Sequence, residues 1–261
     1  MKRSLFPSLL CALLLLSLAG CGSRDNYNCL PEPLPADKVK AMESNFTTLR
    51  CRVVSFNENN VLLAGEDAEN PDIYTLDTEE RTDDVQLAAG DLVEITYGSV
   101  AETYPARFAE VRSVTVLEDE FDDRCALYLR VLSDLWDKDA GLNGSGVEYV
   151  SVDLSATSLS PAERSAAAWC FAQSHGAAPL EFSYEQLCAE GYVSGLAGED
   201  AFPAWENGVL FTITETDAPA VFNANKWRTV LGAYGFSKCV AVQNNDGAWG
   251  DYRINGGEWI S

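Results

Sequence analysis

Five short strand-like segments lie between residues 47 and 117, the first and last of them alternate apolar and polar side chains, and clusters of turn residues separate them. A period of two is typical of strands with one buried face. Several short strands in succession, with turns between them, indicate a small barrel or a strongly bent sheet. We therefore predict a five-stranded β-barrel-like domain over residues 38–118, with strands at 47–56, 61–64, 73–76, 92–97 and 107–117.

Three of these stretches carry a resemblance to a known family. They are Val53–Leu63, Gly90–Tyr97 and Glu102–Arg107, and the most specific part is Tyr104-Pro105. Together they resemble a small β-domain of many Gram-positive bacterial lipoproteins, which is similar to oligonucleotide/oligosaccharide-binding barrels. The resemblance covers residues 47–117. It implies a barrel fold and a cell-surface setting, and it implies no catalytic residue because the family has no assigned activity.

The N-terminus has the parts of an export signal. A basic start precedes an apolar run of 14 residues, Leu5 to Leu18, whereas a membrane-spanning helix needs about 20. The run leads into Leu18-Ala19-Gly20-Cys21, which resembles the lipobox of bacterial lipoproteins. This implies a signal peptide over residues 1–20, a lipid on Cys21 and a place on the outer face of the cytoplasmic membrane. The alternatives are an ordinary secreted protein cut near Ala19 or an uncleaved anchor.

A proline-containing segment follows the lipidated cysteine. Residues 21–37 include Pro31, Pro33 and Pro35 and few large apolar side chains. Prolines keep such a segment extended, so we predict a tether between the membrane and the folded part.

The charge of the chain restricts its partners. Loss of Lys2 and Arg3 with residues 1–20 changes the formal charge from −22 to −24. Phosphate backbones and anionic headgroups repel such a chain, so nucleic acid is excluded as a partner. The expected partners are the membrane, through the lipid, and an unknown extracellular protein or glycan.

An acidic linker, residues 119–124, separates the barrel from a second region at 125–261. Helical spacing marks 125–136, and capping boxes at Ser160 and Ser183 begin two further helices. Strands are expected at 148–154, 209–215, 230–243 and 249–254. The fold class is therefore α+β: a small five-stranded β-barrel-like domain followed by an α+β domain with helices packed on an antiparallel sheet.

Cysteine and histidine usage gives little sign of a metal centre. Six cysteines remain outside Cys11 and Cys21, and we favour a disulfide between Cys170 and Cys188, which lie on the two capped helices. Free, packed thiols are the alternative. The single histidine, His175, is expected at a helix end. No cofactor or metal is expected, although residues 137–148 partly match a calcium loop that lacks its central glycine.

The C-terminal end is rich in aromatic residues, including Trp259. Core packing is one explanation, and a glycan- or peptide-binding surface is the other. The candidate ligand-binding residues are Trp227, Arg228, Tyr234, Trp249 and Tyr252. No nucleophile motif occurs, so catalytic residues are unknown. We expect a surface-anchored binding or scaffolding module. The alternative is a cell-wall or glycan hydrolase. Such an enzyme would need two carboxylates about 5–10 Å apart in a cleft.

Overall fold

A computed structural model describes residues 46–57, 59–67, 72–79, 85–118, 120–144, 146–197, 201–218, 220–245, 247–249 and 251–261. All of these lie in one compact unit, Ser44–Ser261. The predicted signal peptide, Cys21 and the tether lie outside the described residues.

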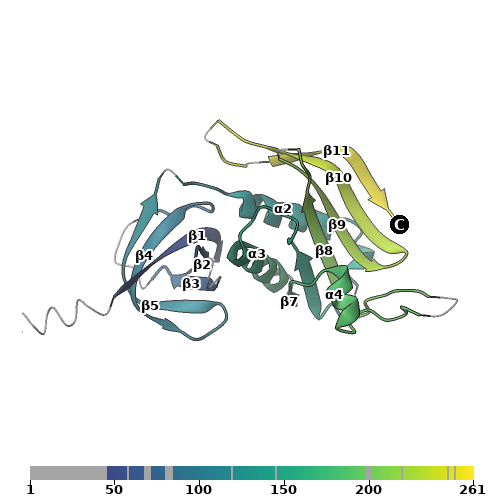
Figure 1. Cartoon of the computed structure of the whole chain (residues 1–261), viewed down its shortest axis with the longest axis horizontal. Coiled ribbons are helices and arrows are strands. Elements are labelled where there is room, and N and C mark those ends of the chain that lie inside the picture. Colours follow the sequence, from purple (N-terminus) through teal and green to yellow (C-terminus); the bar gives the residue numbers. More distant parts are fainter. Residues whose placement is uncertain are drawn as a thin grey trace, which may run out of the picture. The chain divides into compact units, whose positions relative to one another are not determined.

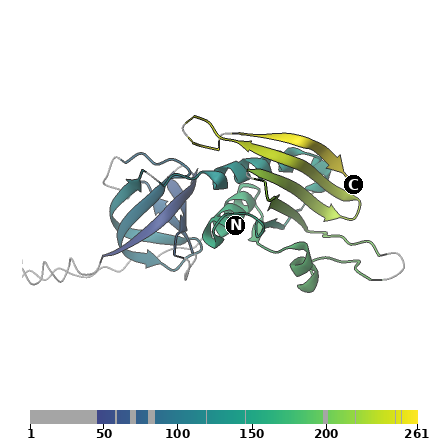
Figure 2. The same ribbon diagram turned by 45° about the horizontal axis from the view of Figure 1, so that its top comes forward.

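The first part of this unit is a closed barrel with the strand order β1-β2-β3-β5-β4 (Figures 1 and 2). Strand β3 is parallel to β5, and the other neighbours are antiparallel. The prediction of a five-stranded barrel is confirmed. The strands are β1 (Thr47–Asn57), β2 (Asn60–Gly65), β3 (Ile73–Asp77), β4 (Leu92–Ala101) and β5 (Ala106–Leu117).

One long strand closes the barrel. Residues 47–52 of β1 pair with β4, while residues 51–57 pair with β2. An irregularity between Val53 and Ser55 interrupts the second pairing. Because successive side chains of a strand point to opposite faces, Val53 joins the barrel core and Val54 packs on the outside, among the residues of the second region.

The second region is built on a six-stranded sheet with the order β11-β10-β9-β8-β6-β7. Its elements are α2 (Arg124–Asp137), η1 (Ala140–Leu142), β6 (Tyr149–Asp153), α3 (Pro161–Ser174), β7 (Ala178–Leu180), α4 (Tyr184–Ala189), β8 (Gly208–Glu215), β9 (Val221–Thr229), β10 (Gly232–Val242) and β11 (Asp251–Ile260).

The prediction of an antiparallel sheet is wrong in one part. Strand β6 is parallel to both β7 and β8, so the sheet is mixed, and the described chain as a whole is mostly β. The physical reason is the connection through α3: a strand that returns by way of a helix can lie parallel to its predecessor. Two strands were not predicted, the three-residue β7 and the polar-looking β9.

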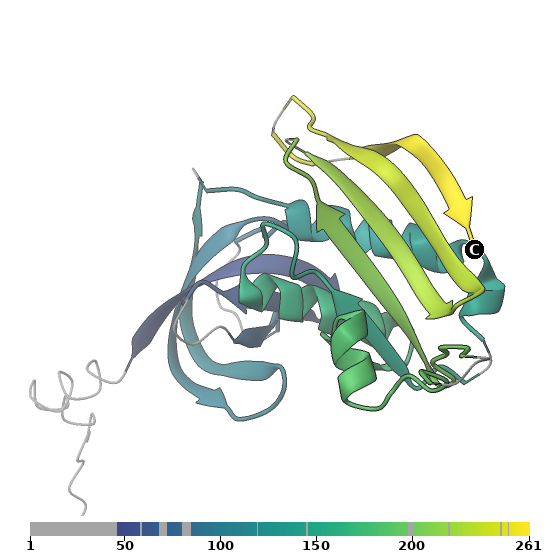
Figure 3. The same cartoon turned by 45° about the vertical axis from the view of Figure 1, so that its right-hand side comes forward.

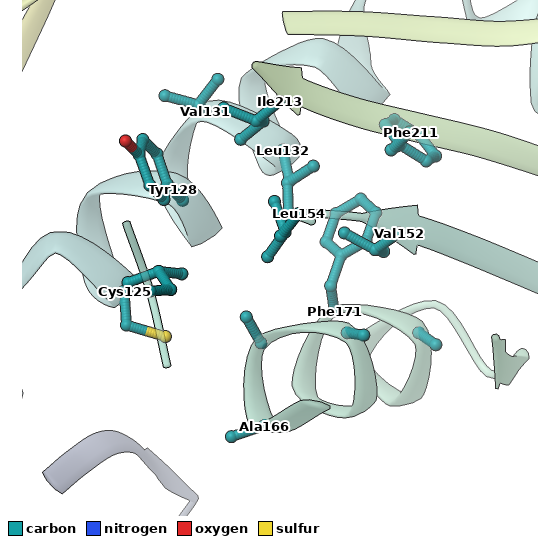
Figure 4. Close-up of a cluster of buried hydrophobic side chains, with 14 of the residues drawn as sticks. Cys125, Tyr128, Val131, Leu132, Val152, Leu154, Ala166, Phe171, Phe211 and Ile213 are labelled. Atoms are coloured by element: carbon teal, nitrogen blue, oxygen red, sulfur yellow. The ribbon is translucent and has the colours of Figure 1, made fainter. Parts of the chain in front are cut away.

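Helices α2 and α3 supply apolar faces to the largest core (Figure 4). Leu132 of α2, Phe171 of α3 and Phe211 of β8 are all at most 3% exposed and point into the same cluster. The same core includes Leu62 and Ile73 of the barrel, so α3 contacts β1, β2 and β3. The junction between the barrel and the second region is therefore part of the hydrophobic core.

Local signals placed the helix ends correctly. Both predicted capping boxes form, with the Ser160 hydroxyl accepting from the Glu163 amide and the Ser183 hydroxyl accepting from that of Gln186. His175 is the residue that ends α3, as expected, and its ring stacks on Trp136 with centroids 3.7 Å apart. Burial lowers the pKa of His175, which favours the neutral ring in this stack.

The predicted disulfide does not form. Cys170 on α3 borders the core beneath α2 and α3, and its sulfur lies 3.3 Å from the Ser55 hydroxyl. Cys188 on α4 borders a different cluster, around Trp205 and Leu210. The two helices pack against different clusters, which the sequence alone did not show. The described cysteines are all free thiols: Cys51, Cys125, Cys170, Cys188 and Cys239.

Candidate functional site

Strand alternation gives the six-stranded sheet two chemically different faces. On β8, Phe211 and Ile213 belong to the core formed with α2 and α3. Successive side chains of a strand alternate, so Leu210 and Thr212 point to the opposite side. We call this second side the outer face. The strands β8 to β11 that carry it run side by side in Figure 3.

Helix α4 covers one part of the outer face. Its Leu187 packs with Val193, Trp205 and Leu210 in a cluster of their own. Beside this cluster the face is hollowed into a pocket with a volume of about 340 Å³, here called the outer-face pocket. The residues that line it are Tyr184, Leu210, Thr212, Asn225, Lys226, Trp227, Ala233 and Trp259.

Trp259 lines the outer-face pocket and packs on the neighbouring strand. It pairs with Gly235 across β10 and β11. A Cβ atom on Gly235 would lie 2.4, 2.5 and 2.5 Å from three atoms of the indole. The indole therefore packs directly against the backbone of Gly235. Trp259 is 40% exposed, so the sheet supports one side of the residue while part of it faces solvent.

Trp227 and Tyr184 form the opposite side of the pocket. Their ring centroids are 4.9 Å apart and the planes are at 82°, an edge-to-face arrangement that fixes both rings. Thr212 and Asn225 lie opposite each other on β8 and β9, in the same cross-strand row as Trp259. Within the described part of the chain, neither side chain makes a hydrogen bond to another protein group. Their hydroxyl and amide groups are therefore available to a ligand.

Lys226 borders the pocket, but its ammonium group is on the other face of the sheet. Nζ donates to the carbonyl oxygens of Trp136, at 3.1 Å, and Asp139, at 3.3 Å. It also donates to the carbonyl oxygen of Lys138 and, at 3.0 Å, to Oδ1 of Asn143. The residue is fully buried, and burial lowers the pKa of Lys226 to about 8. The ammonium group thus binds the C-terminal end of α2, where carbonyl oxygens lack helical partners.

Comparison with known proteins shows little similarity. No protein-family model matches the chain, and no curated protein matches it. The chain is weakly similar to the solved aspartyl tRNA synthetase from Entamoeba histolytica, with 11% identity and a TM-score of 0.23. That match covers 91% of this chain and 58% of the synthetase, so the chain spans little more than half the length of that protein. A likeness this weak supports no statement about fold or activity.

The five predicted ligand-binding residues do not form one site. Trp227 lines the outer-face pocket, whereas Arg228 is not among the residues that line it. The Arg228 guanidinium donates to the carbonyl oxygen of Leu142, at 3.1 Å, and to that of Glu206. The guanidinium group is thus already paired with main-chain carbonyl groups, so the prediction that Arg228 binds ligand is not supported.

The remaining three predicted residues have structural partners on the side of the core. Tyr252 donates to the Asp134 carboxylate at 2.8 Å, and Tyr234 donates to Glu258. Trp249 packs against the core, as do the other two. Core packing, the alternative explanation for the aromatic C-terminal end, therefore accounts for Tyr234, Trp249 and Tyr252.

Sequence reasoning missed Tyr184, Thr212 and Asn225, and it named Trp259 only as part of an aromatic-rich end. Thr212 and Asn225 become neighbours because β8 pairs with β9 in the register that places them opposite each other. A strand prediction at β9 would have found the alternation of Asn225 and Trp227 on one face, which is the available signal.

Two described carboxylates border one cavity, as a glycosidase would require. Glu66 and Glu163 border a cavity of about 300 Å³, but Arg52 lies between them, at 3.4 and 3.9 Å. Glu163 also accepts the Ser160 amide at 2.8 Å as part of the helix cap. Both carboxylates already have structural partners, so this pair does not support the hydrolase alternative.

A third carboxylate, Glu215, is similarly engaged. It accepts hydrogen bonds from Tyr128 and, at 2.8 Å, from Ser158. Burial opposes ionisation of Glu215, but these hydrogen bonds lower its pKa overall. A general acid needs a raised pKa, so Glu215 is suited to a structural network and not to protonating a leaving group. In the described part of the chain, no three His, Cys, Asp or Glu side chains are grouped to hold a metal.

Proposed function

We propose that this protein is a lipid-anchored binding module that holds an extracellular ligand in the outer-face pocket. The observation that carries the proposal is the combination of a supported, partly exposed indole with polar side chains that have no partner within the described chain. Aromatic surfaces with a few convergent polar groups are typical of small-ligand sites. Binding is favoured over hydrolysis because the described lining of the pocket includes no carboxylate.

We also infer that the barrel is of the oligonucleotide/oligosaccharide-binding type and that the second region is an α+β domain. The closed five-strand order supports the first inference, and the contacts of α2 and α3 with the sheet support the second. Barrels of this type bind ligands on the face of strands 2 and 3. Helix α3 contacts those strands here, which favours the second sheet as the binding surface.

The anchor in this proposal is the lipid on Cys21. Within the ranges that the structure describes, no helix is long and apolar enough to cross a membrane. The mature chain carries strong negative charge, which disfavours adsorption to anionic lipid. The acyl chains would then be the main attachment, and more than one chain is needed for stable binding.

Cys21→Ala is therefore expected to release the protein from the membrane. Fractionation of cells that express the full chain, followed by a high-salt wash, measures this. The wild type should stay in the membrane pellet and the variant should appear in the soluble or secreted fraction. Cys188→Ala, a thiol of the folded part, serves as the control and should stay in the pellet. A membrane-bound Cys21→Ala protein would contradict the lipid anchor.

Occupation of the pocket can be tested without knowing the ligand. A photoreactive benzoyl-phenylalanine replaces Tyr184 in the full chain, and Phe56→benzoyl-phenylalanine is the control, because Phe56 is an aromatic on β1 that is 49% exposed. Illumination of intact cells should give a covalent adduct, seen by mass spectrometry, at position 184 and not at 56. No adduct at 184, or equal adducts at both positions, would contradict the proposed function.

A further inference from the structure

We propose that the ligand of the outer-face pocket is an uncharged sugar ring of a glycan, stacked on Trp259 and hydrogen-bonded to Thr212 and Asn225. The inference rests on the proposed binding function and names the class of ligand that this site accepts.

The first argument is the position of the Trp259 indole. The indole packs against Gly235 of the neighbouring strand, and Trp259 is still 40% exposed. The face of an aromatic ring carries partial negative charge. The C–H bonds on one side of a pyranose ring carry partial positive charge, so a sugar lies well on such a surface. Glycine at position 235 is needed for this geometry, because any side chain there would displace the indole.

The second argument is the polarity of the remaining lining. A sugar ring has apolar faces and a rim of hydroxyl groups, each of which donates and accepts. Thr212 offers a hydroxyl and Asn225 offers an amide, and neither is paired within the described chain. Trp227 lies on the same strand as Asn225 and contacts Tyr184 edge to face. The pocket thus combines stacking surfaces with neutral donors and acceptors.

The third argument is the absence of charge from the described lining. Lys226 is the one charged residue among the lining residues, and its ammonium group binds carbonyl oxygens on the opposite side of the sheet. A carboxylate or sulfate would find no cation there, and a chain with a formal charge of −22 repels anions at long range. An uncharged glycan meets neither obstacle.

The geometry is also less suited to a peptide. Peptides often bind by adding a strand to a free sheet edge, where main-chain groups are available. Most of the outer-face pocket lies over β8, β9 and β10, which are paired on both sides, and only Trp259 comes from the edge strand β11. Its groups for recognition are side chains, as a sugar requires.

The test is a glycan array probed with the full-length protein in detergent micelles. The array carries neutral glucans, mannans, galactans and xylans beside sialylated and sulfated glycans and a set of peptides. We expect binding to a neutral glycan, and affinities for that glycan are then measured by titration. Trp259→Ala is expected to lower the affinity at least tenfold. Gly235→Ala is expected to lower it similarly, because its methyl group would clash with the indole and displace it.

Matched variants separate a lost contact from a damaged fold. Phe56→Ala removes an aromatic that is 49% exposed on the barrel and should leave the affinity unchanged. Thermal unfolding of each variant checks the fold, and Trp259→Tyr, which keeps an aromatic face, should retain most of the affinity. The inference is overturned if no neutral glycan binds at millimolar concentration or if Trp259→Ala binds as well as the wild type. Trp259-dependent binding of only peptides or anionic glycans would overturn it while leaving the proposed binding function intact.

Discussion

Lys226→Met is expected to lower the free energy of unfolding by about 1–3 kcal/mol, the cost of leaving buried acceptors without their donor. The Lys226 ammonium group is the shared donor for four oxygen atoms at the end of α2. Methionine fills the same volume but donates nothing, so these buried acceptors lose their partner. The carbonyl groups at a helix C-terminus also lose a favourable positive charge.

Urea unfolding at pH 7, followed by tryptophan fluorescence, measures the effect. The matched control is Lys138→Met, a lysine whose ammonium lies 3.1 Å from Glu258 at the protein surface. Exposed ion pairs contribute about 0–1 kcal/mol, so this control should change little. If Lys226→Met and Lys138→Met have the same small effect, the ammonium group does not hold the end of α2.

The same lysine explains a pattern that sequence reasoning left ambiguous. Residues 137–148 partly match a calcium loop, and in the structure the oxygen atoms of Asp139 and Asn143 do surround a cation. That cation is Lys226, which is more than 80 positions away in the sequence. The pattern indicated a group of oxygen ligands, but the distant partner depends on strand β9, which was not predicted.

Local signals explain what could be predicted. The first and last barrel strands alternate and turn residues bound the strands, and both capping boxes contain their complete set of hydrogen-bonding residues. Such signals need only a few neighbouring residues. Strand β9 contains Asn223, Asn225 and Lys226, so its alternation was hidden by polar residues whose burial depends on the rest of the fold.

The candidate site depends on pairing at long range. Trp259 reaches the pocket because β11 pairs with β10 with a shift between Ser237 and Cys239. A slip of one residue would move Trp259 to the side of the core. Similarly, Tyr184 reaches Trp227 only because α4 packs on the outer face. No local pattern contains this information, which is why four of the five predicted ligand-binding residues lie away from this pocket.

Alkaline pH is expected to destabilise the protein through its buried thiols. Burial, with a smaller contribution from Glu66, raises the pKa of Cys51, and burial raises that of Cys125. An unfolded cysteine titrates near about 8.5. The folded state therefore keeps protons that the unfolded state loses, and stability that is complete below about pH 8.5 falls as the pH rises above it. Each thiol contributes a slope of about 1.4 kcal/mol per pH unit once the unfolded thiol is ionised.

Cys51→Ala is the variant that isolates one thiol. Its free energy of unfolding, measured in urea between pH 8 and 11, should fall less steeply than that of the wild type, by about 1.4 kcal/mol per pH unit near pH 10. The lowered pKa of Lys226 acts in the opposite direction, because the unfolded lysine binds more protons above pH 8. That contribution is common to both proteins and cancels in the comparison.

Val53→Ala provides the control for the cavity that the cysteine variant creates. Val53 lies two residues from Cys51 in the same barrel core and is 1% exposed. Its truncation costs stability at every pH but removes no titrating group, so its slope should equal that of the wild type. If Cys51→Ala and Val53→Ala shift the curve by amounts that do not depend on pH, the thiol ionises as freely in the barrel as in the unfolded chain. The barrel interior would then admit water around Cys51, in conflict with a closed and packed core.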